Sequence, residues 1–363
     1  MKIFKILLPF FLSQLILSQT LKIDTLKNEL VSDGANYFLL RVNDLHNAHI
    51  LKIDLSNSKF CFETFRPNKL EKTSLQFSEL AKTKKVIASI NADFFSFENS
   101  WSANPQVQNG EPVLLFSPNR PQIIFSDCNN SKIEIIKFEG KIILIDTTYS
   151  FTNVNGNKYK KSISFHNYFS NPSRIDTTCK IIYLRKINQT KFLNDTSIFI
   201  IEENNYSDYK IAIPNSISLK SKINDTLKII YQINPEIKNI SNLVSGAGWL
   251  LNNNISDSIA WHKNEKLSKS FVNTIHPRSV VGFNLKENQF YFIAIDGRQN
   301  SSTGMTFFQI INLLNFLKIS DALNFDGGGS TTLVINGVVV NSPSDVSGER
   351  EVANTLMLIE RNN

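Results

Sequence analysis

The stretch of chain from Asp296 to Thr332 carries residue types that could do chemistry at both of its ends. It opens with Asp296-Gly297-Arg298 and closes with Asn324-Phe325-Asp326-Gly327-Gly328-Gly329-Ser330-Thr331-Thr332. A carboxylate can act as a base or a nucleophile, and glycines let backbone N–H groups approach and bind an anion such as phosphate. The glycines could instead form only a tight turn. No GKS or GKT follows them, so this is not a nucleotide-binding loop of that kind.

Three predicted elements position these residues. Gln289 to Ile295 is apolar and aromatic, which predicts a buried strand. The apolar residues that follow have the spacing of an amphipathic helix: Phe307, Ile310, Ile311, Leu314 and Leu317. Ala322 to Phe325 predicts a second short strand. This order favours a right-handed crossover between parallel strands of one sheet, so we expect Asp296 and Asp326 at the same edge.

Two arginines and a second glycine loop could join the same site. In His276-Pro277-Arg278-Ser279, Pro277 restricts His276 to an extended conformation and so directs Arg278. A guanidinium group fits phosphate or carboxylate with two parallel hydrogen bonds. A structural salt bridge is the alternative for Arg278, but a second arginine, Arg298, beside a glycine loop favours anion binding. Ser245-Gly246-Ala247-Gly248 is either a simple bend or a second close approach of backbone to a ligand.

The N-terminal part contributes further candidates. Asn36 to Ser56 alternates apolar and polar residues and predicts a hairpin, and Ser74 to Lys82 predicts a short helix. The buried strand predicted at 86–90 leads to Asn91 and Asp93. Asp93 could bind substrate, or it could cap a turn or a helix. Phe95 and Trp101 could offer a face to a sugar ring, although aromatic residues more often lie in a core.

The chain between residues 117 and 242 contains short β-like runs between loops rich in Asn and Ser, and no segment with a helical period. The predicted fold class is therefore α+β, with a mixed β-sheet core, few helices and a β-rich middle insertion. Residues 20–360 are expected to form a single domain, in which 117–242 is an elaboration or a subdomain.

Composition excludes several classes of function. The chain has 363 residues and a net charge of +7, but its charges are scattered, so nucleic acid is not an expected partner. The three cysteines, Cys61, Cys128 and Cys179, are too far apart for a metal knuckle. At most one pair could form a disulfide, and we interpret them as small core residues.

Residues 1–19 have the pattern of a signal peptide. Lys2 and Lys5 precede the apolar run from Ile6 to Leu17, after which the chain becomes small and polar. The run is shorter than the ~20 residues of a membrane-spanning helix, although a short anchor is the alternative. No later segment could span a bilayer, so the mature chain is expected to be exported, to the periplasm or the medium.

Five motifs, in this order along the chain, resemble those of the phosphodiester glycosidase family. They are residues 91–95, 245–248, 276–279, 296–298 and 324–332. The resemblance implies an exported hydrolase that cleaves the glycosidic bond of a sugar-1-phosphodiester. It implies catalytic roles for Asp296, Asp326, Arg278 and Arg298. It implies substrate binding by Asn91, Asp93, Gly246, Gly248, Gly297, Gln309, Asn324, Gly327, Gly328, Gly329, Ser330 and Thr331.

No cofactor is required by this interpretation, although calcium is possible, with Asp93 and Asp326 among its ligands. The chain departs from the family at Ala92-Asp93, where relatives usually have two glycines, and at Gln309, where they commonly have glutamate. These departures leave room for a non-catalytic surface module that binds phosphorylated glycans. An ordinary secreted glycosidase without a preference for phosphate is a third interpretation.

Overall fold

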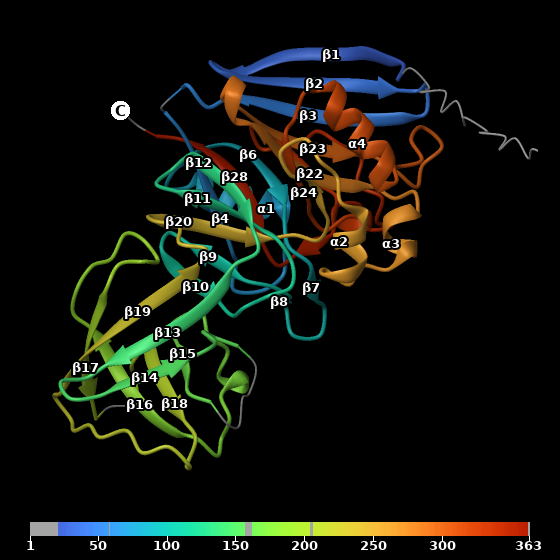
Figure 1. Ribbon diagram of the computed structural model, residues 1–363. Coiled ribbons are helices and arrows are strands. Elements are labelled where there is room, and N and C mark those ends of the chain that lie inside the picture. Colours follow the sequence, from blue (N-terminus) through green and yellow to red (C-terminus); the bar gives the residue numbers. More distant parts are fainter. Residues whose placement is uncertain (1–20, 58, 157–161, 204–205, 362–363) are drawn as a thin grey trace, which may run out of the picture.

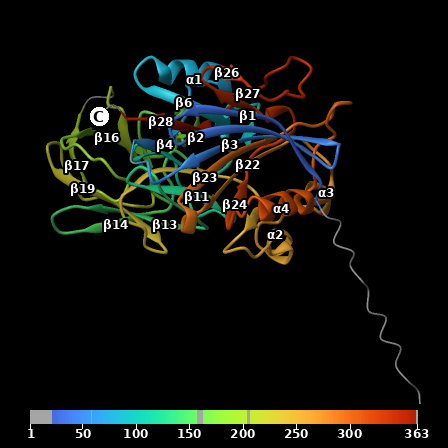
Figure 2. The ribbon, with the colours of Figure 1, turned by 90° about the horizontal axis from the view of Figure 1, so that it is seen from above.

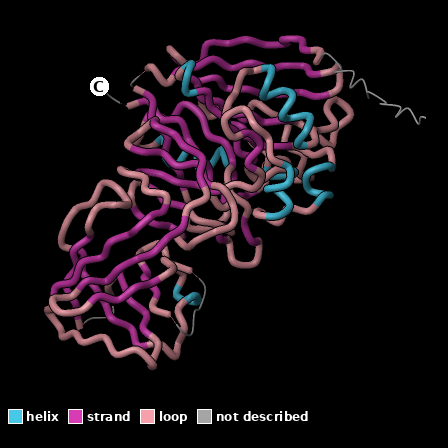
Figure 3. The backbone as a smooth tube through the Cα atoms, viewed as in Figure 1, coloured by secondary structure: helices cyan, strands magenta, loops and turns pink. Residues whose placement is uncertain are grey.

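The computed structural model describes residues 21–57, 59–156, 162–203 and 206–361, and the predicted signal peptide lies outside these ranges. Strands dominate the structure and helices are few (Figure 3), as the predicted α+β class requires. The β-rich middle of the chain forms a separate lobe at the lower left of Figure 1, and the remaining segments form the body. No helix in the described ranges is both long and apolar enough to cross a membrane.

A seven-stranded sheet forms one layer of the body. Its order is β1 (Ile23–Ser32), β2 (Ala35–Val42), β3 (His46–Asp54), β23 (Gln289–Ile295), β22 (Arg278–Asn284), β24 (Asp321–Asn324) and β21 (Trp249–Leu251). The strand β22 pairs antiparallel with both β23 and β24, so these two run parallel to each other, one strand apart. The predicted crossover is confirmed, and both aspartates follow strands that end at one edge.

A second sheet packs on the first. Its order is β26 (Val338–Val339), β25 (Leu333–Ile335), β6 (Lys85–Asn91), β28 (Thr355–Glu360) and β4 (Phe60–Phe65). Between the two sheets lie stacked and tilted rings, among them Phe62 and Phe290, whose centroids are 4.3 Å apart. Burying so much aromatic surface is a major source of stability.

Helices cover the outer faces of the two sheets. The helix α4 (Phe307–Phe316) packs its apolar stripe on the first sheet, beside α2 (Ser258–Lys263) and α3 (Lys269–Asn273). The helix α1 (Thr73–Ala81) covers the second sheet, through residues that include Phe77 and Leu80. Figure 2 shows α1 and α4 on opposite sides of the body. The body is thus a helix–sheet–sheet–helix stack.

Smaller sheets complete the chain. A five-stranded sheet has the order β10 (Glu111–Leu114), β9 (Gln106–Gln108), β20 (Ile240–Ser245), β11 (Gln122–Ser126) and β12 (Asn130–Glu134). Two-stranded pairs are formed by β5 (Glu71–Lys72) with β27 (Glu351–Val352), and by β7 (Phe95–Ser96) with β8 (Trp101–Ser102).

The lobe is built on a seven-stranded antiparallel sheet. Its order is β14 (Thr148–Phe151), β13 (Lys137–Ile143), β19 (Thr226–Asn234), β17 (Ser197–Glu202), β16 (Lys180–Lys186), β18 (Tyr209–Ile213) and β15 (Ser164–His166). Its core includes Phe151, Phe165 and Phe199. Only two residues separate the lobe from the five-stranded sheet at its start, because β12 ends at Glu134 and β13 begins at Lys137. The division of the chain into domains stays a prediction.

One expectation about the cysteines is wrong. Cys61 on β4 and Cys128 in the turn after β11 form a disulfide, with Cα atoms 4.7 Å apart, so they are not merely small core residues. Cys179 is the free thiol. The sequence allowed one pair but gave no means of choosing it, because the partners come from different sheets.

The glycine loop before β21 generates a stability prediction. Gly248 has a φ of +100°, and a Cβ there would collide with the ring of Phe307. We expect Gly248→Ala to lower the free energy of unfolding by about 1–2 kcal/mol through the left-handed backbone and by a further 1–3 kcal/mol or so through crowding. Urea denaturation followed by circular dichroism measures this change.

The matched control is Gly348→Ala. Gly348 has a φ of +82° but no atom within 4 Å of an added Cβ, so only the backbone term of about 1–2 kcal/mol applies. Equal losses in the two variants would contradict the account of close packing against α4.

Candidate active site

Asn91, the last residue of β6, joins the edges of the two stacked sheets. Its side-chain Nδ2 donates to the carbonyl of Asp326 (2.7 Å), and its Oδ1 accepts from the hydroxyl of Ser279 (2.6 Å) and the N–H of Thr332 (3.1 Å). The N–H of Asp326 in turn donates to the carbonyl of Ala92 (2.8 Å). Asn91 was expected to bind substrate, but its amide is occupied in positioning the Asp326 loop.

Asp326 lies half-buried directly after β24. The N–H of Gly327 donates to its Oδ1 (3.0 Å). Burial raises the pKa of this carboxyl to about 6, and Ser330, the Gly327 N–H and the positive charge of Arg350 oppose part of the rise. The carboxyl therefore titrates close to neutral pH, as an acid or base in catalysis often does.

Asp93 is a second carboxyl with an altered pKa. It is 1% exposed and accepts hydrogen bonds from the N–H (2.9 Å) and the side-chain Nδ2 (2.8 Å) of Asn104. Burial raises its pKa to about 7, against the lowering effects of Asn104 and Arg120. Because the backbone of Asp326 bonds to Ala92, the two carboxyl-bearing residues come from adjoining segments.

The three glycines after Asp326 form a tight 3₁₀ turn at Gly328–Ser330. The N–H of Gly327 is taken by Asp326 itself, and that of Gly328 donates to the carbonyl of Pro277 (2.9 Å). Two of the N–H groups expected to bind a phosphate are therefore already engaged. The glycines have another effect, because a Cβ at Gly328 would lie 3.0 Å from the Arg298 guanidinium and one at Gly329 would collide with that of Arg350.

Arg278 lies buried on the helix-covered face of the first sheet. Its guanidinium donates to three carbonyls, those of Phe271 (2.9 Å), Thr274 (2.8 Å) and Met305 (3.1 Å), and lies over the Phe307 ring. Burial, and secondarily Arg298, lowers its pKa to about 10. The contacts recorded for this side chain fasten α3 and the loop before α4, and none of them is to Asp326.

Arg298 and Gly297 sit at the same edge. Arg298 is exposed, with a φ of +58°, and its Nη2 lies 3.4 Å from Nδ1 of His276. None of the ion pairs of the described residues involves it. Gly297 packs its backbone on Pro277, where a Cβ would lie 2.8 Å from the Pro277 nitrogen. Of the two predicted arginines, Arg298 is the one whose charge is free to meet a ligand.

Asp296 is committed to other partners. Its Oδ2 lies 2.9 Å from Nε2 of His49, whose Nδ1 lies 2.8 Å from the Tyr37 hydroxyl, and its Oδ1 accepts from the N–H of Ser342 (2.8 Å). Its carboxylate thus shares no hydrogen-bond partner with that of Asp326. The two aspartates lie at one edge as expected, but the recorded bonds place Asp296 in a structural network.

Several other predicted residues have structural contacts. Gln309 forms a capping box, its Oε1 accepting from the N–H of Thr306 (2.8 Å). Asn324 donates to the carbonyls of Ala247 (3.0 Å) and Phe325 (2.7 Å). Gly246 lets its loop approach the carbonyl of Asn324 closely. Ser330 and Thr331 are buried beside the glycine turn.

Charged residues that the sequence did not single out border the site. The buried Glu265 accepts from the N–H groups of Gly248 (2.7 Å) and Trp249 (3.0 Å), and burial raises its pKa. The second glycine loop therefore does bind a carboxylate, although one of its own chain. Arg120 lies near both Asp93 and Glu265, and its guanidinium stands over the Phe94 ring. These side chains lie in loops and form no local motif, so no signal in the sequence marked them.

Metal binding has no support from clustering. The described residues contain no group of three or more His, Cys, Asp or Glu side chains that could hold an ion. Asp93 has amide partners, and Asp326 accepts a backbone N–H. The expectation about calcium stays a prediction.

Comparison with known proteins fits this geometry. The family described as phosphodiester glycosidase matches residues 188–359, which include Arg278, Asp296 and Asp326. This matched region, which is just under half of the chain, belongs to the phosphodiester glycosidase family. Asn91 and Asp93 lie outside the matched range, so their place in the site rests on the structure.

A curated relative and two solved structures are similar to this chain. The mouse N-acetylglucosamine-1-phosphodiester alpha-N-acetylglucosaminidase is 30% identical over 125 residues, which are 32% of this chain and 23% of that protein, so the match spans about a quarter of the relative. A hypothetical protein from Synechocystis has a TM-score of 0.71 at 17% identity, over 94% of this chain and 68% of the other. A protein from Burkholderia pseudomallei whose name describes it as exported has a TM-score of 0.65 at 17% identity, over 88% of this chain and 76% of the other.

Burial of Asp93 predicts a pH dependence of stability for this protein. Because the folded pKa of about 7 lies above that of an unfolded aspartate, the folded state binds the proton more tightly. The free energy of unfolding should therefore fall as pH rises from about 4 through about 7. We expect Asp93→Asn, which cannot titrate, to have a smaller fall, measured by urea denaturation across this range.

Asp257→Asn serves as the control, because Asp257 is an exposed helix cap that asparagine can replace. Its pH dependence should match that of the wild type. A wild-type slope that Asp93→Asn leaves intact would show that Asp93 is not the group responsible.

Proposed function

We propose that this protein is an exported hydrolase that cleaves the bond between a sugar and the phosphate of a sugar-1-phosphodiester. The observation that carries the proposal is the pair of carboxyls of the buried Asp93 and the half-buried Asp326. Their pKa values are raised to about 7 and about 6 on adjoining segments at one edge of the fold. The mouse relative acts, by its name, on an N-acetylglucosamine-1-phosphodiester, which supports this substrate class.

The two carboxyls suit different roles. Between the two pKa values Asp326 is mostly ionised while Asp93 is mostly protonated. Asp326 then serves as the base for an attacking water, or as the nucleophile at the anomeric carbon. The carbon–oxygen bond breaks with its electron pair leaving on the phosphate, to which Asp93 can give its proton. A phosphate is already a good leaving group, so this assistance need be only modest.

This assignment revises the pair of aspartates expected from the sequence. Asp296 has its carboxylate occupied by His49 and the Ser342 N–H, whereas Asp93 adjoins Asp326 through the backbone bond to Ala92. In the proposal Asp93 takes the place that Asp296 was given.

In this proposal Arg298 supplies the positive charge that stabilises the departing phosphate. Its guanidinium lies against Gly328 in the turn after Asp326 and has no carboxylate partner among the described residues. A fixed cation that meets charge as it develops stabilises a transition state more than a ground state. Arg278 acts indirectly, by holding α3 and the loop before α4 in place.

Export has three supports. Residues 1–19 have the pattern of a signal peptide. The disulfide between Cys61 and Cys128 is typical of an oxidising compartment. The Burkholderia pseudomallei protein of similar fold is described as exported.

Substitution at the site tests the chemistry. With UDP-N-acetylglucosamine as substrate and released sugar as readout, we expect Asp326→Asn to lower kcat by about 10²–10⁴-fold, since a base or nucleophile is lost. Arg298→Ala should lower kcat/KM by roughly 10²-fold, as the loss of one anion-stabilising donor does elsewhere.

Two comparisons make that assay discriminating. Arg185→Ala, at an exposed arginine that pairs with Glu202 in the lobe, should leave kcat/KM unchanged. On a p-nitrophenyl glycoside, which has no phosphate, Arg298→Ala should lower kcat/KM much less. Equal cleavage of both substrates would favour an ordinary glycosidase, and retained binding of the UDP-sugar without any turnover would favour a non-catalytic module.

The carboxyl pair also predicts the pH profile of the reaction. Activity requires Asp326 ionised and Asp93 protonated, so kcat/KM should rise through about pH 6 and fall above about pH 7. In Asp93→Asn the fall on the alkaline side should disappear, together with part of the maximal rate. A profile whose alkaline side is the same in wild type and variant would remove Asp93 from the acid role.

A further inference from the structure

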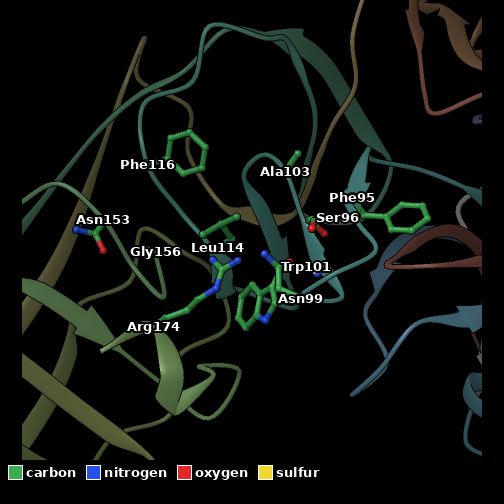
Figure 4. Close-up of a pocket in the computed structure, with 11 residues that line it drawn as sticks. Phe95, Ser96, Asn99, Trp101, Ala103, Leu114, Phe116, Asn153, Gly156 and Arg174 are labelled. Carbon is green, nitrogen blue, oxygen red and sulfur yellow. Dashed lines mark hydrogen bonds between the residues drawn. The ribbon is translucent and has the colours of Figure 1, made fainter. Parts of the chain in front are cut away.

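A cavity of about 270 Å³ lies between the β7–β8 hairpin and the lobe, and we call it the junction pocket. The hairpin contributes Ser96 and Trp101, and the lobe contributes Asn153 and Arg174 (Figure 4). Small-molecule sites usually start at about 300 Å³, so this volume suits a ligand the size of one sugar rather than a polymer segment.

Asn153 is the first observation that points to a ligand. It is 1% exposed, yet neither its Nδ2 nor its Oδ1 has a hydrogen-bond partner. Leaving a buried donor and a buried acceptor unpaired costs about 1–3 kcal/mol for each group. Gly156 packs closely on this amide, since a Cβ there would lie 2.8 Å from Oδ1. An amide that is free at both atoms matches a hydroxyl group, which both donates and accepts.

Two cations at Trp101 are the second observation. The guanidinium groups of Arg174 and Arg66 lie 4.0 and 4.4 Å from the centre of its ring. Each donates to a carbonyl, Arg174 to Asn155 (3.3 Å) and Arg66 to Ser100 (3.2 Å), and neither has an ion pair among the described residues. Trp101, for which the sequence left open a sugar-stacking face or the more frequent core position, is 4% exposed and supports these two charges.

Like charges held together without a carboxylate favour an anion between or beside them. Burial lowers the pKa of Arg174, and burial and, secondarily, the positive charge of Arg174 lower that of Arg66 to about 10, so a bound anion would stabilise the charged forms of both. Asp176 lies two residues after Arg174, and one of its oxygens accepts from the Thr178 N–H (2.9 Å) to hold a turn. Guanidinium groups bind phosphate and carboxylate with the same two-pronged geometry.

We propose that the junction pocket binds an anionic sugar, a ring whose phosphate or carboxylate group meets Arg174 and whose hydroxyl groups meet the amide of Asn153. None of Asp93, Asp326, Arg278 and Arg298 lines the pocket. The pocket lies next to the candidate active site. Phe95 lines the pocket, and the ring of the preceding residue, Phe94, has its centroid 5.9 Å from that of Phe271. The Arg278 guanidinium also lies over the Phe271 ring. The proposal does not depend on the proposed hydrolysis.

Isothermal titration calorimetry on the mature chain tests this binding with glucose 6-phosphate, glucuronate, glucose and inorganic phosphate. We expect at least one of the anionic sugars to bind roughly tenfold or more tightly than glucose and than inorganic phosphate. If only glucose 6-phosphate binds tightly, the anion that the pocket recognises is phosphate. If only glucuronate binds tightly, the anion is carboxylate. The proposal is overturned if glucose or inorganic phosphate binds as tightly as both anionic sugars. It is also overturned if neither anionic sugar binds.

Variants locate the site. Arg174→Gln should weaken binding of the anionic sugar by roughly tenfold or more, and Arg185→Gln in the same lobe should not change it. Asn153→Ala should also weaken binding, and it decides the question if circular dichroism shows that Arg174→Gln is misfolded. Undiminished binding by the folded variant overturns the assignment. Asp326→Asn should bind as the wild type does, so a failure of the proposed hydrolysis and a failure of this pocket remain distinguishable.

Discussion

A single buried amide fixes the distance between two sheets at the place where their strands end. Asn91 satisfies the Asp326 carbonyl, the Ser279 hydroxyl and the Thr332 N–H at once, and it is fully buried. In an interior of low polarity each of these bonds is stronger than in water, and each would be costly to leave unmade. The turn that carries Asp326 is therefore held from both sheets, which allows a carboxyl to sit in a defined position without a partner of opposite charge.

The site keeps its carboxyls at some expense of stability. Asp93, Asp326 and Glu265 all have raised pKa values because burial disfavours their charged forms. A core optimised only for stability would place apolar residues there. Groups whose charged forms are disfavoured often cluster at functional sites. The apolar core between the two sheets, with its aromatic rings, compensates for the stability that burial of these carboxyls costs.

Much of this fold could be predicted from periodicity. Gln289 to Ile295 is a strand, the apolar stripe beginning at Phe307 is a helix, and the crossover places Asp296 and Asp326 at one edge. Which way each side chain points was not accessible, because it depends on register. Arg278 faces the helices and Asp296 reaches His49 on β3, so two residues from one edge enter different surroundings.

Pairings between distant loops were equally out of reach of the sequence. The carboxylate of Glu265 occupies N–H groups of a glycine loop, and Arg350 fills the space that Gly329 leaves open. Neither residue belongs to a local motif, and their roles follow only from tertiary contacts. Gln309 is the opposite case, because the Thr306-x-x-Gln309 spacing is typical of the capping box that the structure contains, although the family resemblance had placed Gln309 among the substrate-binding residues.

The link between Cys61 and Cys128 closes a loop of 67 residues that contains Asn91, Asp93 and Trp101. By the chain-entropy relation, closing such a loop destabilises the unfolded chain by about 4 kcal/mol. A newly made, reduced chain lacks that contribution and is correspondingly easier to unfold. In a protein exported as proposed, oxidation after translocation would supply this stability, so the segment that carries Asn91 and Asp93 would gain it only in the oxidising compartment.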